Sequence, residues 1–377
     1  MNPAFAGMLL FDFPGGNVTT SGIDTSPGNA SLKVLANSLA VNGPIKTGTG
    51  SLTLDASSIV VNGPITAQNA PISITSQSLQ VNDAVSAGTG PFTLSSTAAT
   101  LSAPVTAGSL TISSGDQVSI NGPAITVFGS VSTAGQLTVA GGAQLQIGGS
   151  LSGSGSISIG SASGSASQAA STVSAQSFSL PSVTIGPSGA LDLIENAIAT
   201  ASSTRSLSIA PGGRLDLANN LLDIGYSSGL DPIQIIHGYL TSGYANGTWN
   251  GWGIISSAAA GNPAAYGIGY ADGNTFSRNA DSIELRFTLN GDANLDGTVN
   301  LADLTALARN FGKQGQWDTG DFNYDGSTDL SDFLILSREY GQSLASYPAP
   351  ADANFLNDRL IARRACIRPL PTNHPPQ

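Results

Sequence analysis

Charged residues are scarce in this chain: they make up 10% of its 377 residues, and the formal net charge is −11. The segment 1–190 holds five acidic side chains and two lysines, with no arginine and no histidine. Proteins bind nucleic acids and anionic lipids through basic patches. The composition gives no electrostatic basis for either ligand, and we expect no nucleic acid partner.

Cysteine and long hydrophobic runs are also lacking. The one cysteine, Cys366, cannot form an intramolecular disulfide, so stability must come from backbone hydrogen bonds or from a metal. No run of about 18 apolar residues is present, so we expect no transmembrane helix. The first residues lack the basic segment that opens a signal peptide, and no export signal is predicted from them.

Residues suited to catalysis are sparse as well. Hydrolysis of a sugar polymer needs paired carboxylates, or a base near a cation, and the repeat region offers no such group at matched positions. The other acid groupings are Asp192 with Glu195 and Asp216 with Asp223, each without a supporting partner. His237 is expected on a helix face. We therefore expect a protein that is not an enzyme.

What the chain does have is an internal repeat. The pattern Val-Asn-Gly-Pro-Ile returns, intact or altered, at 41–45, 61–65, 81–85 and 101–105. Between the copies, apolar residues alternate with Ser or Thr, which is the period-2 pattern of half-buried strands, and Asn-Gly and Gly-Pro steps supply turns. The copies begin 20 residues apart, and units of about this length stack on one another in solenoid proteins. We predict a mainly β fold in which residues 1–190 form a parallel right-handed β-solenoid.

Residues 191–288 carry a different pattern, which predicts a β-rich cap and connecting region. The Asp231-Pro232 step can start a short helix through Leu240, and a strand is predicted at 282–287. Aromatic residues gather between them: Tyr239, Tyr244, Trp249, Trp252, Tyr266 and Tyr270. We expect this cluster to pack the cap, and the alternative is a platform on which a sugar stacks.

Two segments near the C-terminus concentrate the acidic residues, since eight of the 24 acids lie between positions 292 and 332. Each segment places oxygen-bearing side chains at positions 1, 3, 5, 9 and 12 of a loop with glycine at position 6, and the second loop matches the first position by position. Ca²⁺ takes six to eight oxygen ligands, and this spacing wraps them around one ion, with a backbone carbonyl from position 7. We predict two Ca²⁺ sites. The predicted ligand residues are Asp292, Asn294, Asp296, Thr298, Asn300 and Asp303, and Asp321, Asn323, Asp325, Ser327, Asp329 and Asp332.

A helix is predicted after each loop, over 303–311 and 332–340. The tandem loops, the Asp at position 12 and the strand-like run in place of an entering helix resemble type I dockerins over residues 291–342. The resemblance implies a calcium-dependent module, at 289–342, that docks onto a cohesin domain, often in polysaccharide-degrading assemblies or at cell surfaces. The positions similar to dockerin recognition residues are Leu301, Ala302, Leu330 and Ser331.

The order of β-repeats followed by a calcium module is similar to that of large secreted proteins of planctomycete-type bacteria. The leading hypothesis is a non-catalytic secreted or cell-surface protein with a structural or adhesive role, docked to a cohesin-like domain or a cell-surface protein. The alternative is a component of a carbohydrate-degrading assembly whose solenoid binds polysaccharide, and a third possibility is that the loops serve only to stabilise the cap. The tail, 343–377, is predicted to be disordered.

Overall fold

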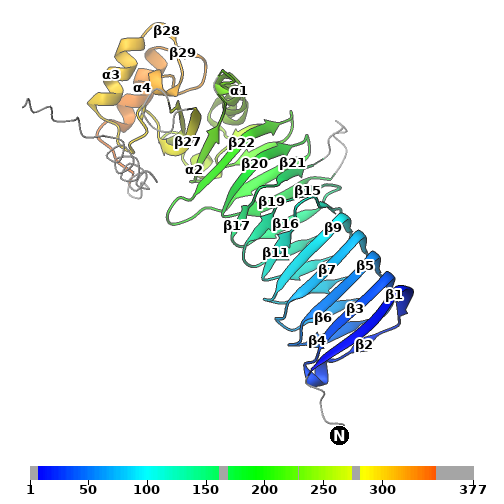
Figure 1. Ribbon diagram of the computed structural model, residues 1–377. Helices are drawn as coiled ribbons and strands as arrows, with labels where there is room; N and C mark the ends of the chain where they lie inside the picture. The colour runs from blue at the N-terminus through cyan, green and yellow to red at the C-terminus, as the bar shows by residue number, and fades with distance from the viewer. Residues whose placement is uncertain (1–6, 161–168, 228, 274–280, 345–377) are drawn as a thin grey trace, which may run out of the picture.

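The computed structural model describes residues 7–160, 169–227, 229–273 and 281–344. It is mainly β, and its strands wind into a β-solenoid of about 10 turns, as predicted. Figure 1 shows the turns stacked from the N-terminal end, in blue, to a C-terminal group of helices in yellow and orange. Two sheets line the solenoid, one of 16 strands and one of 11.

The first sheet contains the longest strands together with several short ones. They are β1 (Met8–Thr20), β3 (Ser31–Val41), β5 (Leu52–Val61), β7 (Ile72–Val81), β9 (Pro91–Leu101), β11 (Ser109–Ile112), β12 (Gln117–Ile120), β14 (Val131–Thr133), β15 (Gln136–Val139), β17 (Ser150–Ser152), β18 (Ser156–Ile159), β20 (Ser177–Ile185), β22 (Ala201–Ile209), β24 (Leu221–Gly225), β26 (Tyr266–Asp272) and β27 (Ser282–Leu289). The second sheet is built from shorter strands. They are β2 (Ile23–Asp24), β4 (Ile45–Gly48), β6 (Ile65–Ala67), β8 (Val85–Ser86), β10 (Val105–Ala107), β13 (Ile125–Val127), β16 (Gln144–Ile147), β19 (Ser171–Ala175), β21 (Gly189–Leu193), β23 (Arg214–Asp216) and β25 (Gly253–Ile255).

The register between turns explains why the sequence repeat folds in this way. Leu54 pairs with Ile74, and Ile74 pairs with Leu94. All three side chains are fully buried. Each aliphatic side chain therefore lies above its counterpart in the next turn, and the stacked side chains form one continuous apolar core.

The Asn-Gly turns pack tightly on one another along the outside of the solenoid. The side-chain amide of Asn62 donates to Asn42 Oδ1 at 3.0 Å, and that of Asn82 donates to Asn62 Oδ1 at 2.9 Å. A Cβ atom at Gly63 would lie 2.6 Å from the carbonyl carbon of Gly43. Glycine is required there because successive turns approach too closely for a side chain.

The parallel ladder extends past residue 190, where we placed the end of the solenoid. β22 pairs in parallel with β20 and β24, and β23 pairs in parallel with β21 and β25. The predicted boundary therefore falls inside the ladder, because these later turns lack the Val-Asn-Gly-Pro pattern that marks the earlier ones. The ladder ends where β27 runs antiparallel to β24 and β26 runs antiparallel to β27.

The cap packs helices and aromatic rings over this end of the solenoid. Asp231 Oδ1 accepts a hydrogen bond of 2.9 Å from the N–H of Ile233, as expected for the start of the predicted helix. Trp249 is buried, and its ring meets that of Tyr244 edge-on with 5.3 Å between the centroids. Trp249 thus packs the cap, as we expected, while Trp252 stays 37% exposed.

Helices are confined to the C-terminal part of the described chain, apart from one 3-10 turn. They are α1 (Ile233–Tyr244), α2 (Ser257–Gly261), α3 (Leu301–Asn310) and α4 (Leu330–Glu339), with 3-10 turns η1 (Ser26–Gly28), η2 (Ala245–Gly247) and η3 (Trp317–Thr319). The longest, α1, has 12 residues, and no helix in the ranges given above combines the length and the apolar character that crossing a membrane requires. Of the tail predicted to be disordered, residues 345–377 lie outside the described residues.

Candidate calcium-binding site

The first loop folds around its own polar side chains. Asp292 Oδ1 accepts from the N–H of Asp296 at 3.1 Å, and Asp292 Oδ2 accepts from the N–H of Gly297 at 2.9 Å. Asn294 Oδ1 accepts from the same Asp296 N–H at 3.0 Å, and Asp296 Oδ1 accepts from the N–H of Thr298 at 2.9 Å. Gly297 has a φ of 83°, in the left-handed region that favours glycine. These bonds hold the side chains at positions 1, 3 and 5 in one tight turn.

The remaining predicted ligands of this loop lie at the start of helix α3. Asn300 precedes the helix, and its Oδ1 accepts from the N–H of Ala302 at 2.7 Å. Asp303, in the first turn, accepts from the N–H of Asn300 at 2.8 Å and from that of Asn294 at 3.2 Å. This is a capping box, and a carboxylate there is also favoured by the helix dipole. Asp303 therefore joins the two ends of the loop.

The second loop repeats most of these contacts, except that Asp332 accepts from the N–H of Phe322, at position 2, where Asp303 accepts from that of Asn294, at position 3. Asp321 accepts from two loop N–H groups at 3.2 and 2.9 Å, and Asp332 accepts from two at 2.8 and 2.9 Å. The structure thus places the predicted ligand residues along two similar loops. In the second loop, the places of Asn294, Asp296, Thr298 and Asn300 are taken by Asn323, Asp325, Ser327 and Asp329.

Four carboxylates of the loops are almost completely buried: Asp292, Asp303 and Asp332 are 0% exposed and Asp321 is 1% exposed. Burial, reinforced by neighbouring carboxylates, raises the pKa of Asp292 to about 6 and that of Asp321 to about 7. Burial likewise raises the pKa of Asp303 and of Asp332. Buried anions of the same sign are unfavourable unless a cation accompanies them. At neutral pH, the charge in these loops calls for a cation.

The set of donor atoms fits a hard divalent cation such as Ca²⁺, which prefers carboxylate, amide and carbonyl oxygens. Over the described ranges, no three side chains of His, Cys, Asp or Glu come together as a group that could hold a metal ion. The predicted ligand set does not depend on carboxylates alone, since it also includes the amide oxygens of Asn294 and Asn323 and the backbone carbonyls of Thr298 and Ser327. The role of each residue as a Ca²⁺ ligand and the presence of two Ca²⁺ sites remain predictions.

The two loop–helix units close on each other reciprocally. A Cβ atom at Gly291, just before the first loop, would lie 2.8 Å from Leu336 Cα in helix α4, and one at Gly320 would lie 2.8 Å from Leu307 Cα in helix α3. Backbone hydrogen bonds of 2.8 Å connect position 8 of each loop to the glycine after the other loop's helix, Val299 to Gly341 and Thr328 to Gly312. Each unit needs the other for its packing, which explains why the loops occur as a pair.

Position 4 of the second loop connects the module to the end of the solenoid. Tyr324 is buried, and its hydroxyl donates to the carbonyl of Ile268 at 2.8 Å and accepts from the N–H of Ile268 at 3.1 Å. Ile268 belongs to β26, the last strand of the first sheet. An edge strand presents unpaired backbone groups, and Tyr324 satisfies two of them. In the first loop, Leu295 holds the equivalent position and is also buried.

Aromatic rings fill the junction between the calcium loops and the cap. The ring centroid of Tyr324 lies 4.9 Å from that of Tyr244, 5.8 Å from Trp249, 6.4 Å from Tyr270 and 5.5 Å from Trp317. Trp317 Nε1 also donates to the backbone carbonyl at position 1 of the first loop, at 2.7 Å. The two carboxylate-rich loops and the cap therefore share one buried core.

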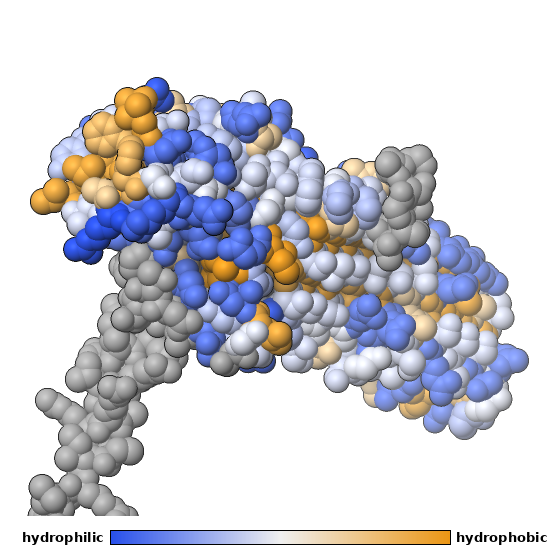
Figure 2. Space-filling model, turned by 90° about the horizontal axis from the view of Figure 1, so that it is seen from above, coloured by the Kyte–Doolittle hydropathy of each residue, from blue (hydrophilic) through white to orange (hydrophobic). Residues whose placement is uncertain are grey.

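The predicted partner-binding residues lie on the outside of the module. Leu301 is 66% exposed and Leu330 is 60% exposed, and Ala302 and Ser331 are exposed beside them. Figure 2 shows hydrophobic residues gathered at this end of the molecule. Exposed apolar patches mark interaction sites. Further large apolar side chains exposed on the module, which were not assigned to a partner surface from the sequence, are Phe311, Phe333, Leu334 and Tyr340.

A pair of acidic residues on the solenoid wall was not predicted from the sequence. Asp223 stands opposite Glu284 in the antiparallel register of β24 and β27, and Arg286 Nε lies 2.8 Å from Glu284 Oε1. Asp216, which we had grouped with Asp223, belongs to the other sheet. The antiparallel return of β27 brings distant parts of the chain together, and no repeat signals it. His237 lies on helix α1, as expected, with Nδ1 2.8 Å from the Tyr270 hydroxyl.

The raised pKa values of the loop carboxylates predict how the metal-free module responds to pH. Asp292 and Asp321 hold protons more tightly in the folded state, with pKa values of about 6 and about 7, than in the unfolded chain, where the ordinary value is 3.8. The stability that these two groups contribute to the metal-free module is therefore fully present below their ordinary pKa of 3.8, and it is lost as the pH rises through their folded pKa values. In chelator, the module should melt at a higher temperature near pH 4 than near pH 8. A chelated module that is more stable at the higher pH would contradict this prediction.

Comparison with known protein families agrees with this geometry. Residues 290–340 match the family model described as Dockerin type I domain. Searches among curated proteins and among solved structures gave no match. Dockerin domains generally bind calcium and dock onto cohesin partners. The chain thus carries, after its β-solenoid, a C-terminal segment that matches the dockerin type I family model.

Proposed function

We propose that this protein is a non-catalytic secreted or cell-surface protein with a structural or adhesive role. The solenoid forms a stalk, and the C-terminal module binds two Ca²⁺ ions and docks onto a cohesin-like domain. The observation that supports this best is the pair of equivalent, carboxylate-rich loops inside the segment that matches dockerin type I domains. Proteins with dockerin domains are typically extracellular or on cell surfaces, which supports the proposed location.

The shared core favours a module that is held at a fixed angle to the stalk. A flexible linker would let a docking module turn freely. Here Tyr324 binds the backbone of β26, and its ring packs against Tyr244 of helix α1. A partner bound to the module would then be presented in one orientation relative to the solenoid axis.

Docking can be tested by binding the full chain to immobilised type I cohesin domains in millimolar calcium. Replacing Leu301 and Leu330 together by alanine is expected to weaken binding at least about tenfold, because exposed apolar anchors in an interface contribute most of its energy. Leu10→Ala is the matched control, since Leu10 is 47% exposed near the other end of the molecule. A chelator should abolish binding. Absence of binding to every cohesin, in calcium, would contradict the docking role.

A second candidate function is membership of a carbohydrate-degrading assembly, in which the solenoid binds polysaccharide or retains catalytic activity. The dockerin match favours it, since dockerin docking is typically cellulosome-like. Incubating the chain with a panel of plant and microbial polysaccharides and measuring reducing ends tests the catalytic form of this candidate. Release of reducing ends that Glu284→Gln abolishes would overturn the non-catalytic proposal. Calcium-dependent stability without any cohesin binding would instead support loops that only stabilise the cap.

A further inference from the structure

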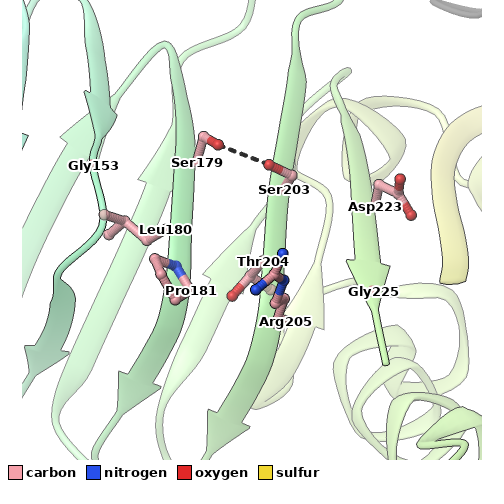
Figure 3. A pocket seen from close by; sticks show the side chains of 9 residues that line it. All are labelled: Gly153, Ser179, Leu180, Pro181, Ser203, Thr204, Arg205, Asp223 and Gly225. Atoms are coloured by element: carbon pink, nitrogen blue, oxygen red, sulfur yellow. Dashed lines mark hydrogen bonds between the residues drawn. The ribbon is translucent and has the colours of Figure 1, made fainter. Parts of the chain in front are cut away.

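A pocket of about 380 Å³ opens on the solenoid wall, outside the calcium loops. Figure 3 shows it across neighbouring strands of the first sheet, with Ser179 on β20, Ser203 and Arg205 on β22, and Asp223 on β24. Ser179, Ser203 and Arg205 are exposed, and Asp223 is partly buried. The pocket is therefore accessible to a ligand from solvent.

The pocket lies where the strand pairing of the first sheet changes, from two short strands per turn to one long strand per turn. β17 and β18 are two short strands of one turn, and both pair with the single long strand β20. Gly153 follows the last residue of β17, and its N–H donates to the carbonyl of Ser179 at 3.1 Å, while Gly225 is the last residue of β24. A Cβ atom at Gly225 would meet no heavy atom nearer than 3.9 Å. The missing side chain at Gly225 therefore leaves open space beside Arg205, whereas Gly153 packs closely on the backbone of Thr133, where a Cβ atom would lie 1.9 Å from the carbonyl oxygen.

The pocket combines hydrogen-bonding groups with apolar surface. The hydroxyl oxygens of Ser179 and Ser203 lie 2.9 Å apart, and each can donate and accept. The Arg205 guanidinium supplies N–H donors, and the Asp223 carboxylate supplies acceptors. Leu180 and Pro181 add apolar surface to the lining. Donors, acceptors and apolar surface side by side match a ligand whose surface alternates in the same way.

The pocket also lies at the end of a row of hydroxyl side chains. From Thr53 on β5 to Ser203 on β22, the outward residue at this register position is Ser or Thr in eight successive strands, and the next residue in the row is Asp223. Successive strands are about 4.8 Å apart. The row offers regularly spaced hydroxyl groups to a ligand that extends along the solenoid axis from the pocket.

We propose that the pocket binds the end of a neutral oligosaccharide or polysaccharide, which extends over the hydroxyl row. A neutral sugar presents hydroxyl groups that donate and accept, together with apolar C–H faces. An acidic sugar is disfavoured, because Asp223 and the neighbouring Glu284 place carboxylates at this wall and the chain has a net charge of −11. This inference does not depend on the docking function, and it gives a site and a ligand class to the polysaccharide binding of the second candidate function.

Calorimetric titration of the full chain in calcium tests the proposal, with cellohexaose, xylohexaose and mannohexaose as neutral probes and hexagalacturonate as the acidic one. At least one neutral probe should bind. Arg205→Ala should lower its affinity at least about tenfold, the cost of a lost charged hydrogen bond. Gly225→Leu, which adds a side chain where a Cβ atom would meet no heavy atom nearer than 3.9 Å, should lower it as well. Arg309→Ala is the matched control, because Arg309 is an exposed arginine on helix α3.

Three results would overturn the proposal: no neutral probe binds, the bound probe keeps its affinity in both pocket variants, or hexagalacturonate binds more tightly than every neutral probe. Melting curves establish that both variants fold. Cohesin binding is measured on the same samples, so that loss of sugar binding with docking retained removes this proposal alone. Loss of docking with sugar binding retained removes the proposed function alone.

Discussion

A chain that carries both Asp292→Ala and Asp321→Ala is expected to lose calcium binding and the folded C-terminal module. Each carboxylate stands at position 1 of its loop, is at most 1% exposed and accepts two backbone N–H bonds. A ligand that binds only the folded state stabilises it by about 2.7 kcal/mol per site at 100 times its Kd, so two sites contribute about 5 kcal/mol. Circular dichroism melting in millimolar calcium should show the helical transition of the module lost or strongly lowered.

The control for this experiment is Asp55→Ala, which removes the same charge from an exposed position on β5 of the solenoid. It should leave the calcium-dependent transition in place. The difference in melting temperature between the wild type and the double variant should be smaller in chelator, because the main interaction that the substitutions remove is the one with the ion. A double variant whose melting still rises with calcium as in the wild type would show that the ion binds elsewhere.

Tyr324→Ala is expected to separate the stability of the module from that of the solenoid cap. The variant loses a buried aromatic ring, at a cost of about 3–5 kcal/mol, and leaves the N–H and carbonyl of Ile268 without the hydroxyl that pairs with them. In the wild type, calcium should slow amide hydrogen exchange in β26 and β27 as well as in the loops. In the variant, calcium should protect only the loops, and the cap should exchange faster at all calcium concentrations.

Two substitutions calibrate this experiment. Tyr324→Phe keeps the ring and removes the hydroxyl, so its cost should be about 1–3 kcal/mol. Tyr340→Ala removes an aromatic ring that is 47% exposed on the same module, and it should leave the exchange of β26 unchanged. If calcium had no effect on amide hydrogen exchange in β26 of the wild-type chain, the prediction would be contradicted, because the shared core would not couple the C-terminal module to the cap.

The parts of the fold that repeat could be predicted from the sequence. The regular spacing of the repeat encodes the register in which Leu54 lies over its counterparts in the next turns, because each turn meets a copy of itself. The paired carboxylate-rich loops could be predicted for the same reason, since the second copy preserves the position of every polar side chain that the first contributes to the predicted ligand set. The two helices begin at Leu301 and Leu330, two residues before the predicted starts at Asp303 and Asp332. The difference arises because Asn300 and Asp329 cap the helices.

The parts of the fold where different segments meet could not be predicted. The position of Tyr324 in its loop does not reveal that its hydroxyl pairs with Ile268, because this contact joins two segments that share no repeat. The pairing of Asp223 with Glu284 depends on the antiparallel return of β27, which reverses the direction of the ladder. Such contacts follow from the tertiary arrangement, and neither periodicity nor spacing indicates them.

Calorimetric titration of calcium into the decalcified full chain tests the central claim most directly. We predict two bound Ca²⁺ ions per chain, one of which is lost in Asp292→Ala and the other in Asp321→Ala, together with a rise in helical signal as calcium binds. If no calcium binds at millimolar concentration, the two carboxylate-rich loops are not metal sites, and the calcium-dependent docking proposed here is contradicted.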